Sequence, residues 1–249
     1  MRSAIALTSM LALAACGGDN SNSSAPVVSS TAVAPAPAPT GTAWVDVVTK
    51  TPEGTFVLGN PNAPIKLIEY GSRNCPVCGR FAAEGMEPLR AKYISAGKVS
   101  YEFRDFLVHG APDFAAALLN QCVPTEAFFT VLDQLFANQN AFLDRTQALV
   151  SQNPQLVDQL QKMPPAQAAA GFAEAIGYIE FMKQQGVPET KARTCLADQK
   201  AGEAISKINA EAVNTNLPGT PTFLINGKVV PNTASWDKLE PALQAAGAR

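Results

Sequence analysis

The spacing of hydrophobic residues changes along the chain and divides it into elements. Residues 65–70 read Ile-Lys-Leu-Ile-Glu-Tyr and are largely apolar on both faces of an extended chain, which is typical of a strand in the middle of a sheet. Residues 99–106 alternate and predict a second long strand. Near the C-terminus, apolar residues flank Asn226-Gly227, which is a strong signal for a β-hairpin within residues 222–230.

Helical spacing dominates most of the remaining chain. We expect a helix from Cys75 to just before Gly97, and a last helix over residues 235–246. Residues 111–214 are also helical in pattern and contain no convincing strand. The sequence therefore predicts an α/β fold in which a helical block interrupts a sheet-forming domain. We divide it into a first sheet-forming part (44–107), a helical insertion (108–216) and a second sheet-forming part (217–249).

The N-terminus is typical of a targeting segment. Met1-Arg2 provides a positive start, and residues 4–13 form an apolar run that is too short to span a bilayer, which takes about 20 residues. The end of this segment, Leu-Ala-Ala-Cys16, resembles the bacterial lipoprotein signal. That resemblance implies that residues 1–16 end at a lipidated Cys16, which anchors the protein to a membrane. The alternative is a plain secretory signal cut near Ala15.

Residues 17–43 consist mainly of Gly, Ser, Ala and Pro with almost no charge. The repeated Ala-Pro pairs at 34–39 favour polyproline II, and the preceding serine-rich part favours flexible coil. We therefore predict a disordered tether that holds the folded domain away from a membrane surface.

Composition agrees with one sizeable domain and excludes one class of partner. The chain has 249 residues, of which 47% are hydrophobic and 16% charged, so it can bury a substantial core. The net charge of −2 gives no indication of a nucleic-acid partner. Five cysteines are an odd number, and assigning Cys16 to a lipid leaves four, which is two pairs.

The chemistry centres on Cys75-Pro76-Val77-Cys78, at the junction between a buried strand and a helix. Proline suits the first helical position, so Cys75 lies where an N-cap residue would be. The positive end of the helix dipole favours a thiolate there. We expect Cys75 to be exposed and nucleophilic, and Cys78, one turn later, to be shielded and to resolve the reaction.

Glu69 lies six residues before Cys75, on the predicted central strand. Burial would raise the pKa of its carboxyl group toward the range in which it exchanges protons with a thiol. The alternative is a carboxylate at a strand end that is hydrogen-bonded to water.

A Cys-X-X-Cys pair by itself also fits half of a zinc site or a structural clip. Structural zinc sites usually take four Cys or His ligands, and outside the pair the chain after Cys16 offers only Cys122, Cys195 and His109. We interpret His109, the only histidine, as a surface residue of a loop.

The cysteine motif, the acid at position 69 and the downstream Gly219-Thr220-Pro221-Thr222-Phe223 resemble the thioredoxin superfamily, and specifically its DsbA-like branch of periplasmic thiol:disulfide oxidoreductases. The resemblance extends from about residue 55 to the C-terminus. It implies a thioredoxin fold with an inserted α-helical domain. It also implies a cis Pro221 beside the active-site cysteines, with the Thr220 backbone free to pair with a substrate strand. The alternative for Pro221 is an ordinary loop proline.

This sequence departs from the family pattern at one position, and the resemblance has one further implication. Val77 stands where the commonest DsbA-like sequence has histidine, so the thiolate stabilisation attributed to that histidine is in doubt here. Some DsbA-like proteins have a second disulfide, which implies a bridge between Cys122 and Cys195. The alternative is two separate buried thiols.

The resulting hypothesis is a periplasmic, lipid-anchored thiol:disulfide oxidoreductase. It would act on protein thiols or disulfides, need no metal or organic cofactor, and be returned to its working state by a membrane redox partner. Two alternatives remain open at this point. One is a protein that handles a soft metal such as copper through the same cysteine pair, and the other is a tethered binding module that keeps only the fold.

Overall fold

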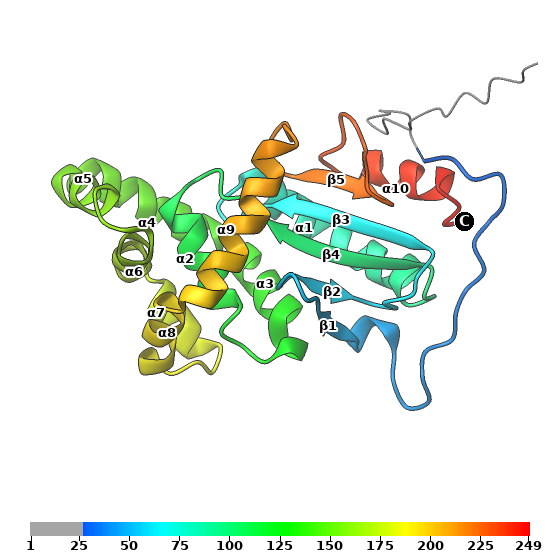
Figure 1. Cartoon of the computed structure of the whole chain (residues 1–249), viewed down its shortest axis with the longest axis horizontal. Coiled ribbons are helices and arrows are strands. Elements are labelled where there is room, and N and C mark those ends of the chain that lie inside the picture. Colours follow the sequence, from blue (N-terminus) through cyan, green and yellow to red (C-terminus); the bar gives the residue numbers. More distant parts are fainter. Residues whose placement is uncertain (1–26) are drawn as a thin grey trace, which may run out of the picture.

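The computed structural model describes residues 27–249, so the predicted signal and Cys16 lie outside the described residues. Its centre is one six-stranded mixed sheet in the order β1-β2-β4-β3-β5-β6 (Figure 1). Only β3 and β4 are parallel, and all other neighbours are antiparallel. The strands are β1 (Val48–Lys50), β2 (Phe56–Leu58), β3 (Ile65–Gly71), β4 (Val99–Asp105), β5 (Thr222–Ile225) and β6 (Lys228–Val229).

The predicted central strand, β3, is paired on both sides. Glu69 lies opposite Phe103 of β4 and opposite Phe223 of β5. Both neighbours are fully buried phenylalanines. The strand that leads to Cys75 is therefore held from both sides by the protein core, which fixes where the following turn begins.

Helices cover both faces of the sheet. On one face lie α1 (Pro76–Leu89), which continues into a π-helical turn (Arg90–Ile94), and α10 (Trp236–Ala245). Their apolar side chains, such as Phe81 and Leu239, share a core with the strands. On the other face, α9 (Gln199–Asn214) crosses the sheet and packs Ile208 and Ala212 against Tyr70 (Figure 1).

A helical domain with its own core lies beside the end of the sheet at which β3 ends (Figure 1). The fold class predicted from sequence, a thioredoxin-type α/β fold with an α-helical insertion, is confirmed. The helices before α9 are α2 (Ala111–Asn120), α3 (Phe128–Ala137), α4 (Gln139–Gln152), α5 (Pro154–Gln161), α6 (Pro165–Ala175), α7 (Tyr178–Gln184) and α8 (Glu189–Leu196).

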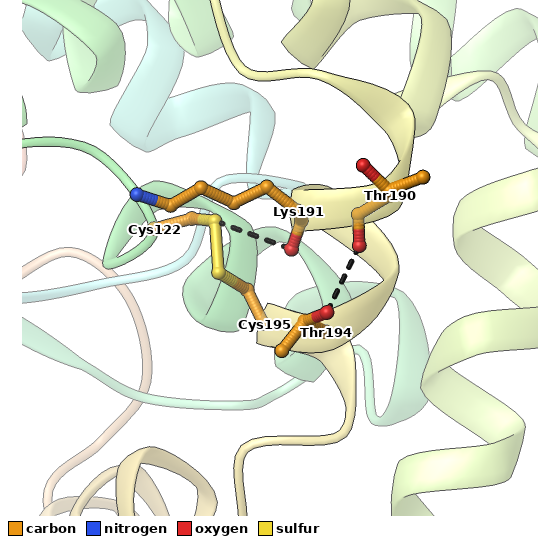
Figure 2. Close-up of a disulfide and its surroundings, with 5 residues drawn as sticks. All are labelled: Cys122, Thr190, Lys191, Thr194 and Cys195. Carbon is orange, nitrogen blue, oxygen red and sulfur yellow. Dashed lines mark hydrogen bonds between the residues drawn. A yellow bond between two sulfur atoms is a disulfide. The ribbon is translucent and has the colours of Figure 1, made fainter.

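A disulfide ties two parts of the helical domain together. Cys122, just after α2, is bonded to Cys195 of α8 with an S–S distance of 2.07 Å. Figure 2 shows the bridge beside α8, with the Cys122 sulfur 3.8 Å from the Lys191 carbonyl oxygen. This bridge confirms the pairing that the family resemblance implied.

The predicted disordered tether covers residues 17–43, of which residues 17–26 lie outside the described residues, and residues 27–43 differ from the prediction. They pass next to the C-terminus and curve around the end of the sheet that lies away from the helical domain (Figure 1). Backbone hydrogen bonds join Ser29 to Ala245 and Val33 to Gly247, and the Trp44 indole donates to the Ala36 carbonyl at 2.7 Å. Val27 and Val33 pack against the core that the sheet shares with α1 and α10. Its prolines restrict the chain to extended conformations, which lowers the entropy lost on docking. We call residues 27–43 the N-terminal strap.

Within residues 27–249, none of the helices combines the length and the apolar character that crossing a membrane requires.

Candidate active site

The two cysteines of the motif lie at the N-terminus of α1, where the sequence placed them. Cys75 is the N-cap residue, with φ −86° and ψ 115°, and Pro76 is the first helical residue. Pro76 is exposed and Val77 is half-buried. Both cysteines are free thiols in this structure. The Cys75 sulfur lies 3.3 Å from the Thr220 carbonyl oxygen, to which the protonated form of the thiol donates.

The two thiols have opposite acidities. A hydrogen bond with the Cys78 thiol, helped by the backbone amides of Cys78 and Val77, lowers the pKa of Cys75 from 9.0 to about 5, although burial opposes this change. Burial is the main cause that raises the pKa of Cys78 well above its usual value. At neutral pH, Cys75 is therefore a thiolate and Cys78 a thiol. This is the division of roles expected of a nucleophile and a resolving cysteine.

The exposure of Cys75 is smaller than predicted. The residue is 6% exposed and Cys78 is 0% exposed. The prediction of an exposed Cys75 is therefore wrong in absolute terms, although Cys75 remains the more accessible of the two. One contact that limits its exposure is with the loop of Thr220 and Pro221, whose Thr220 carbonyl oxygen lies 3.3 Å from the Cys75 sulfur.

That loop places the downstream Thr220-Pro221 motif beside the cysteine motif, although the two are far apart in the sequence. The Thr220-Pro221 peptide bond is cis. Thr220 is half-buried and Pro221 is buried, directly before β5, which pairs with β3. A groove of about 310 Å³ borders the loop, and its lining includes Gly219, Thr220 and Pro221. The loop therefore places the Thr220 backbone beside the Cys75 sulfur, and the groove lies on the side of the loop formed by β5, β6 and the residues after them.

Glu69 is buried beneath the cysteine pair. It is 1% exposed, and the Tyr101 hydroxyl donates to its Oε2 at 2.7 Å. Burial is the main cause that raises the pKa of Glu69 from 4.5 to about 8, and the nearby charge of Cys75 adds to this. Glu69 in turn raises the pKa of Cys78. The carboxyl group is therefore buried as predicted, protonated near neutral pH, and electrostatically coupled to both sulfurs.

Sequence reasoning did not identify the turn between β3 and α1 as part of the site. Asp113 of α2 accepts hydrogen bonds from the Ser72 hydroxyl at 2.7 Å and from the Asn74 amide at 2.8 Å. The Tyr178 hydroxyl of α7 donates to Asn74 Oδ1 at 2.9 Å. All four residues are buried. Two helices of the inserted domain therefore hold the two ends of this turn.

The middle of the turn, Arg73, is a buried charge. It forms an ion pair with Asp105 and donates through Nε to Asn120 Oδ1 at 3.0 Å. Its guanidinium group also lies 5.0 Å from the centre of the Phe103 ring. A buried arginine is stable only when it is paired and hydrogen-bonded, so these contacts fix its position under the site.

His109 has partners that the sequence did not indicate. Its Nδ1 lies 3.0 Å from the Ser72 hydroxyl and 3.3 Å from Asp113 Oδ2, and this carboxylate raises the pKa of His109. Its side chain is 42% exposed. The interpretation of His109 as a surface residue of a loop is therefore confirmed, and the structure adds that one side of its ring is tied to the reactive turn. The partners are separated by 37 and 4 positions in the chain, so the spacing of the residues alone gave no signal.

Comparison with known proteins identifies the family. A family model described as thioredoxin matches residues 51–245. The chain belongs to this thioredoxin family. Disulfide bond formation protein D from Bacillus subtilis is 26% identical over 204 residues, which is 80% of this chain and 81% of that protein. A putative protein-disulfide oxidoreductase from Rickettsia felis is 26% identical, and the match covers 81% of this chain but 63% of that longer protein.

Solved thioredoxin-family structures agree with the fold. A protein-disulfide isomerase from Novosphingobium aromaticivorans superposes with a TM-score of 0.70 at 28% identity, covering 76% of this chain and 95% of that one. The α-DsbA1 protein of Wolbachia pipientis has a TM-score of 0.54 at 21% identity, covering 77% and 91%. These similarities confirm the resemblance to DsbA-like proteins that the sequence motifs indicated.

Proposed function

We propose that this chain is an extracytoplasmic thiol:disulfide oxidoreductase that exchanges disulfides with proteins through Cys75 and Cys78. The observation that carries the proposal is the pair of opposite acidities one helical turn apart, with the more acidic sulfur facing the Thr220-Pro221 loop. The names of the relatives support the same activity.

In the oxidising direction, the Cys75–Cys78 disulfide accepts two electrons from a dithiol substrate. A substrate thiolate attacks the Cys75 sulfur, a mixed disulfide forms, and Cys78 leaves and takes up a proton. A second substrate thiolate then attacks the substrate sulfur of the mixed disulfide. Cys75 leaves readily because a thiol of low pKa is a good leaving group.

In the reducing or isomerising direction, the Cys75 thiolate attacks a substrate disulfide first. Cys78 must lose its proton before it can resolve the mixed disulfide. Glu69 is our candidate for the group that moves this proton, because it is buried beside the pair and its pKa of about 8 suits exchange with a thiol. Thr220 would present its backbone to an extended substrate segment, and Pro76 and Val77 would form the surface around the entering sulfur.

We also propose that the protein works outside the cytoplasm and is anchored by lipid on Cys16. The Leu-Ala-Ala-Cys pattern supports this, and so does the Cys122–Cys195 bridge, because stable disulfides persist mainly in oxidising compartments. A membrane redox partner would then reset the cysteine pair. Copper handling has less support, because no group of three or more Cys, His, Asp or Glu side chains suited to a metal occurs within residues 27–249.

Insulin reduction by the purified protein tests the activity. Turnover should be lost in Cys75→Ser and Cys78→Ser, and the double variant Cys122→Ser/Cys195→Ser serves as a matched control that removes the other cysteine pair and keeps turnover. Equal turnover in Cys75→Ser and the unmodified protein would overturn the proposal, and Cu(I) uptake without any turnover would favour the copper alternative. Equilibration with glutathione gives the direction. A potential near roughly −120 mV, as in DsbA, indicates an oxidase, and one near roughly −270 mV, as in thioredoxin, a reductant.

A further inference from the structure

Gln139 joins the helical insertion to the backbone of the reactive turn. It is the first residue of α4 and is buried, at 4% exposed. Its Nε2 donates to the carbonyl oxygens of Arg73 and Cys75, both at 2.9 Å. One side-chain amide therefore bridges two buried carbonyl groups on either side of Asn74.

The Cys75 carbonyl matters because it belongs to the N-cap residue of α1. It also accepts the Gly79 amide at 3.1 Å, which is the first hydrogen bond of the helix. The extended conformation of Cys75 leaves the amides of Val77 and Cys78 free to face its sulfur. The hydrogen bond from Gln139 fixes this peptide group. It also offsets the partial negative charge of a carbonyl oxygen that lies within the same residue as the thiolate.

The surface of α1 is shaped to receive the glutamine amide. A Cβ atom added at Gly79 would overlap Oε1 and Cδ of Gln139. Glycine inside a helix costs about 1 kcal/mol relative to alanine. Its presence one turn into α1 is therefore explained by the close approach of the Gln139 side chain.

We propose that Gln139 is a positioning residue, through which the helical insertion holds the Cys75 backbone in the conformation that stabilises the thiolate. The proposal rests on the proposed function, in which Cys75 is the nucleophile. It assigns the insertion a role in setting the chemistry of the cysteine pair, in addition to packing beside it.

The test is Gln139→Met in the full chain, because methionine keeps the length of the side chain and removes the donor. The ultraviolet absorbance of the thiolate, followed against pH, measures the acidity of Cys75. Loss of one hydrogen bond to this carbonyl should raise the titration midpoint of Cys75. It should also shift the equilibrium with glutathione about three- to tenfold toward the disulfide form of the protein. Asn140→Ala, at the exposed next position of α4, is the matched control and should leave both quantities unchanged.

A second variant, Gly79→Ala, keeps glutamine at position 139. Its added Cβ atom displaces the Gln139 amide from the side of α1. Alanine favours the helix, so fraying of α1 cannot explain a change in its titration. Both variants should move the Cys75 midpoint in the same direction. If folded Gln139→Met keeps the parent titration and glutathione equilibrium, the inference is overturned, even where its unfolding temperature falls. If Gln139→Met does not fold, an unchanged titration in Gly79→Ala overturns it instead. If the proposed function itself is wrong, the result is different: the unmodified protein already lacks an acidic thiol at Cys75.

Discussion

Glu69→Gln is the substitution whose effect on stability follows most directly from the structure. The carboxyl group is 1% exposed, and its burial raises its pKa from 4.5 to about 8. Glutamine has nearly the same shape and does not ionise. It should therefore remove the pH dependence that this residue contributes to folding, and leave the packing around Tyr101 largely in place.

The sign of the effect follows from proton uptake. In the unfolded chain the Glu69 carboxyl ionises near pH 4.5, whereas in the folded protein it keeps its proton until about pH 8. The contribution of Glu69 to stability is thus fully present below pH 4.5 and is lost as the pH rises through about 8. Each pH unit in this window costs about 1.4 kcal/mol, so the whole window corresponds to a loss on the order of 4–5 kcal/mol.

Urea unfolding of the oxidised protein between pH 4.5 and 9 measures this loss, because the bonded cysteines do not titrate. Burial, the main cause of the raised pKa of Glu69, persists in that form. The difference in unfolding free energy between the parent and Glu69→Gln should change by several kcal/mol, with the variant gaining relative stability as the pH rises. Glu84→Gln, at an exposed position of α1, should show no such trend. A parent-to-variant difference that is constant across the pH range would refute the reasoning.

Three further predictions concern the disulfide, the N-terminal strap and the motif dipeptide. The double variant Cys122→Ser/Cys195→Ser removes a bridge across 73 positions and should lose about 2–4 kcal/mol of unfolding free energy in urea; an unchanged urea midpoint would contradict it. Removing the N-terminal strap should lower the free energy of unfolding by about 1–3 kcal/mol relative to a chain that begins at residue 27, because its hydrogen bonds to the rest of the protein are lost. Thermal unfolding measures this difference, and equal unfolding temperatures would count against docking of the strap. Val77→His places a cation next to the thiolate and should lower the titration midpoint of Cys75 below that of the parent, as measured by the absorbance of the thiolate. A midpoint that rises would show that the imidazole does not act through charge.

The elements around the reactive cysteines could be predicted from the sequence because short-range patterns determine them. The strand over 65–70 is apolar on both faces, Pro76 suits the first helical position, and Asn226-Gly227 suits a tight hairpin turn. These features depend on residues that are neighbours in the chain. Burial of Glu69 could be predicted in the same way, because a central strand is covered on both faces.

The N-terminal strap and the exposure of Cys75 were predicted incorrectly for one shared reason. Both depend on surfaces supplied by distant parts of the chain, namely the C-terminal residues beneath the strap and the Thr220-Pro221 loop beside the sulfur. Composition describes how a segment behaves alone. It does not show whether another segment offers it a surface on which to dock.

The sequence by itself determined the reactive pair, its place at the start of a helix, and the acid behind it, because each is fixed by local geometry. Only the tertiary structure decided how the turn between β3 and α1 is held. Asp113, Gln139 and Tyr178 are 39 to 104 positions away from the residues that they bind in this turn. Packing of the helical insertion against the sheet brings them to buried polar groups that require partners. Which distant side chains meet that requirement depends on tertiary packing, which no local pattern records.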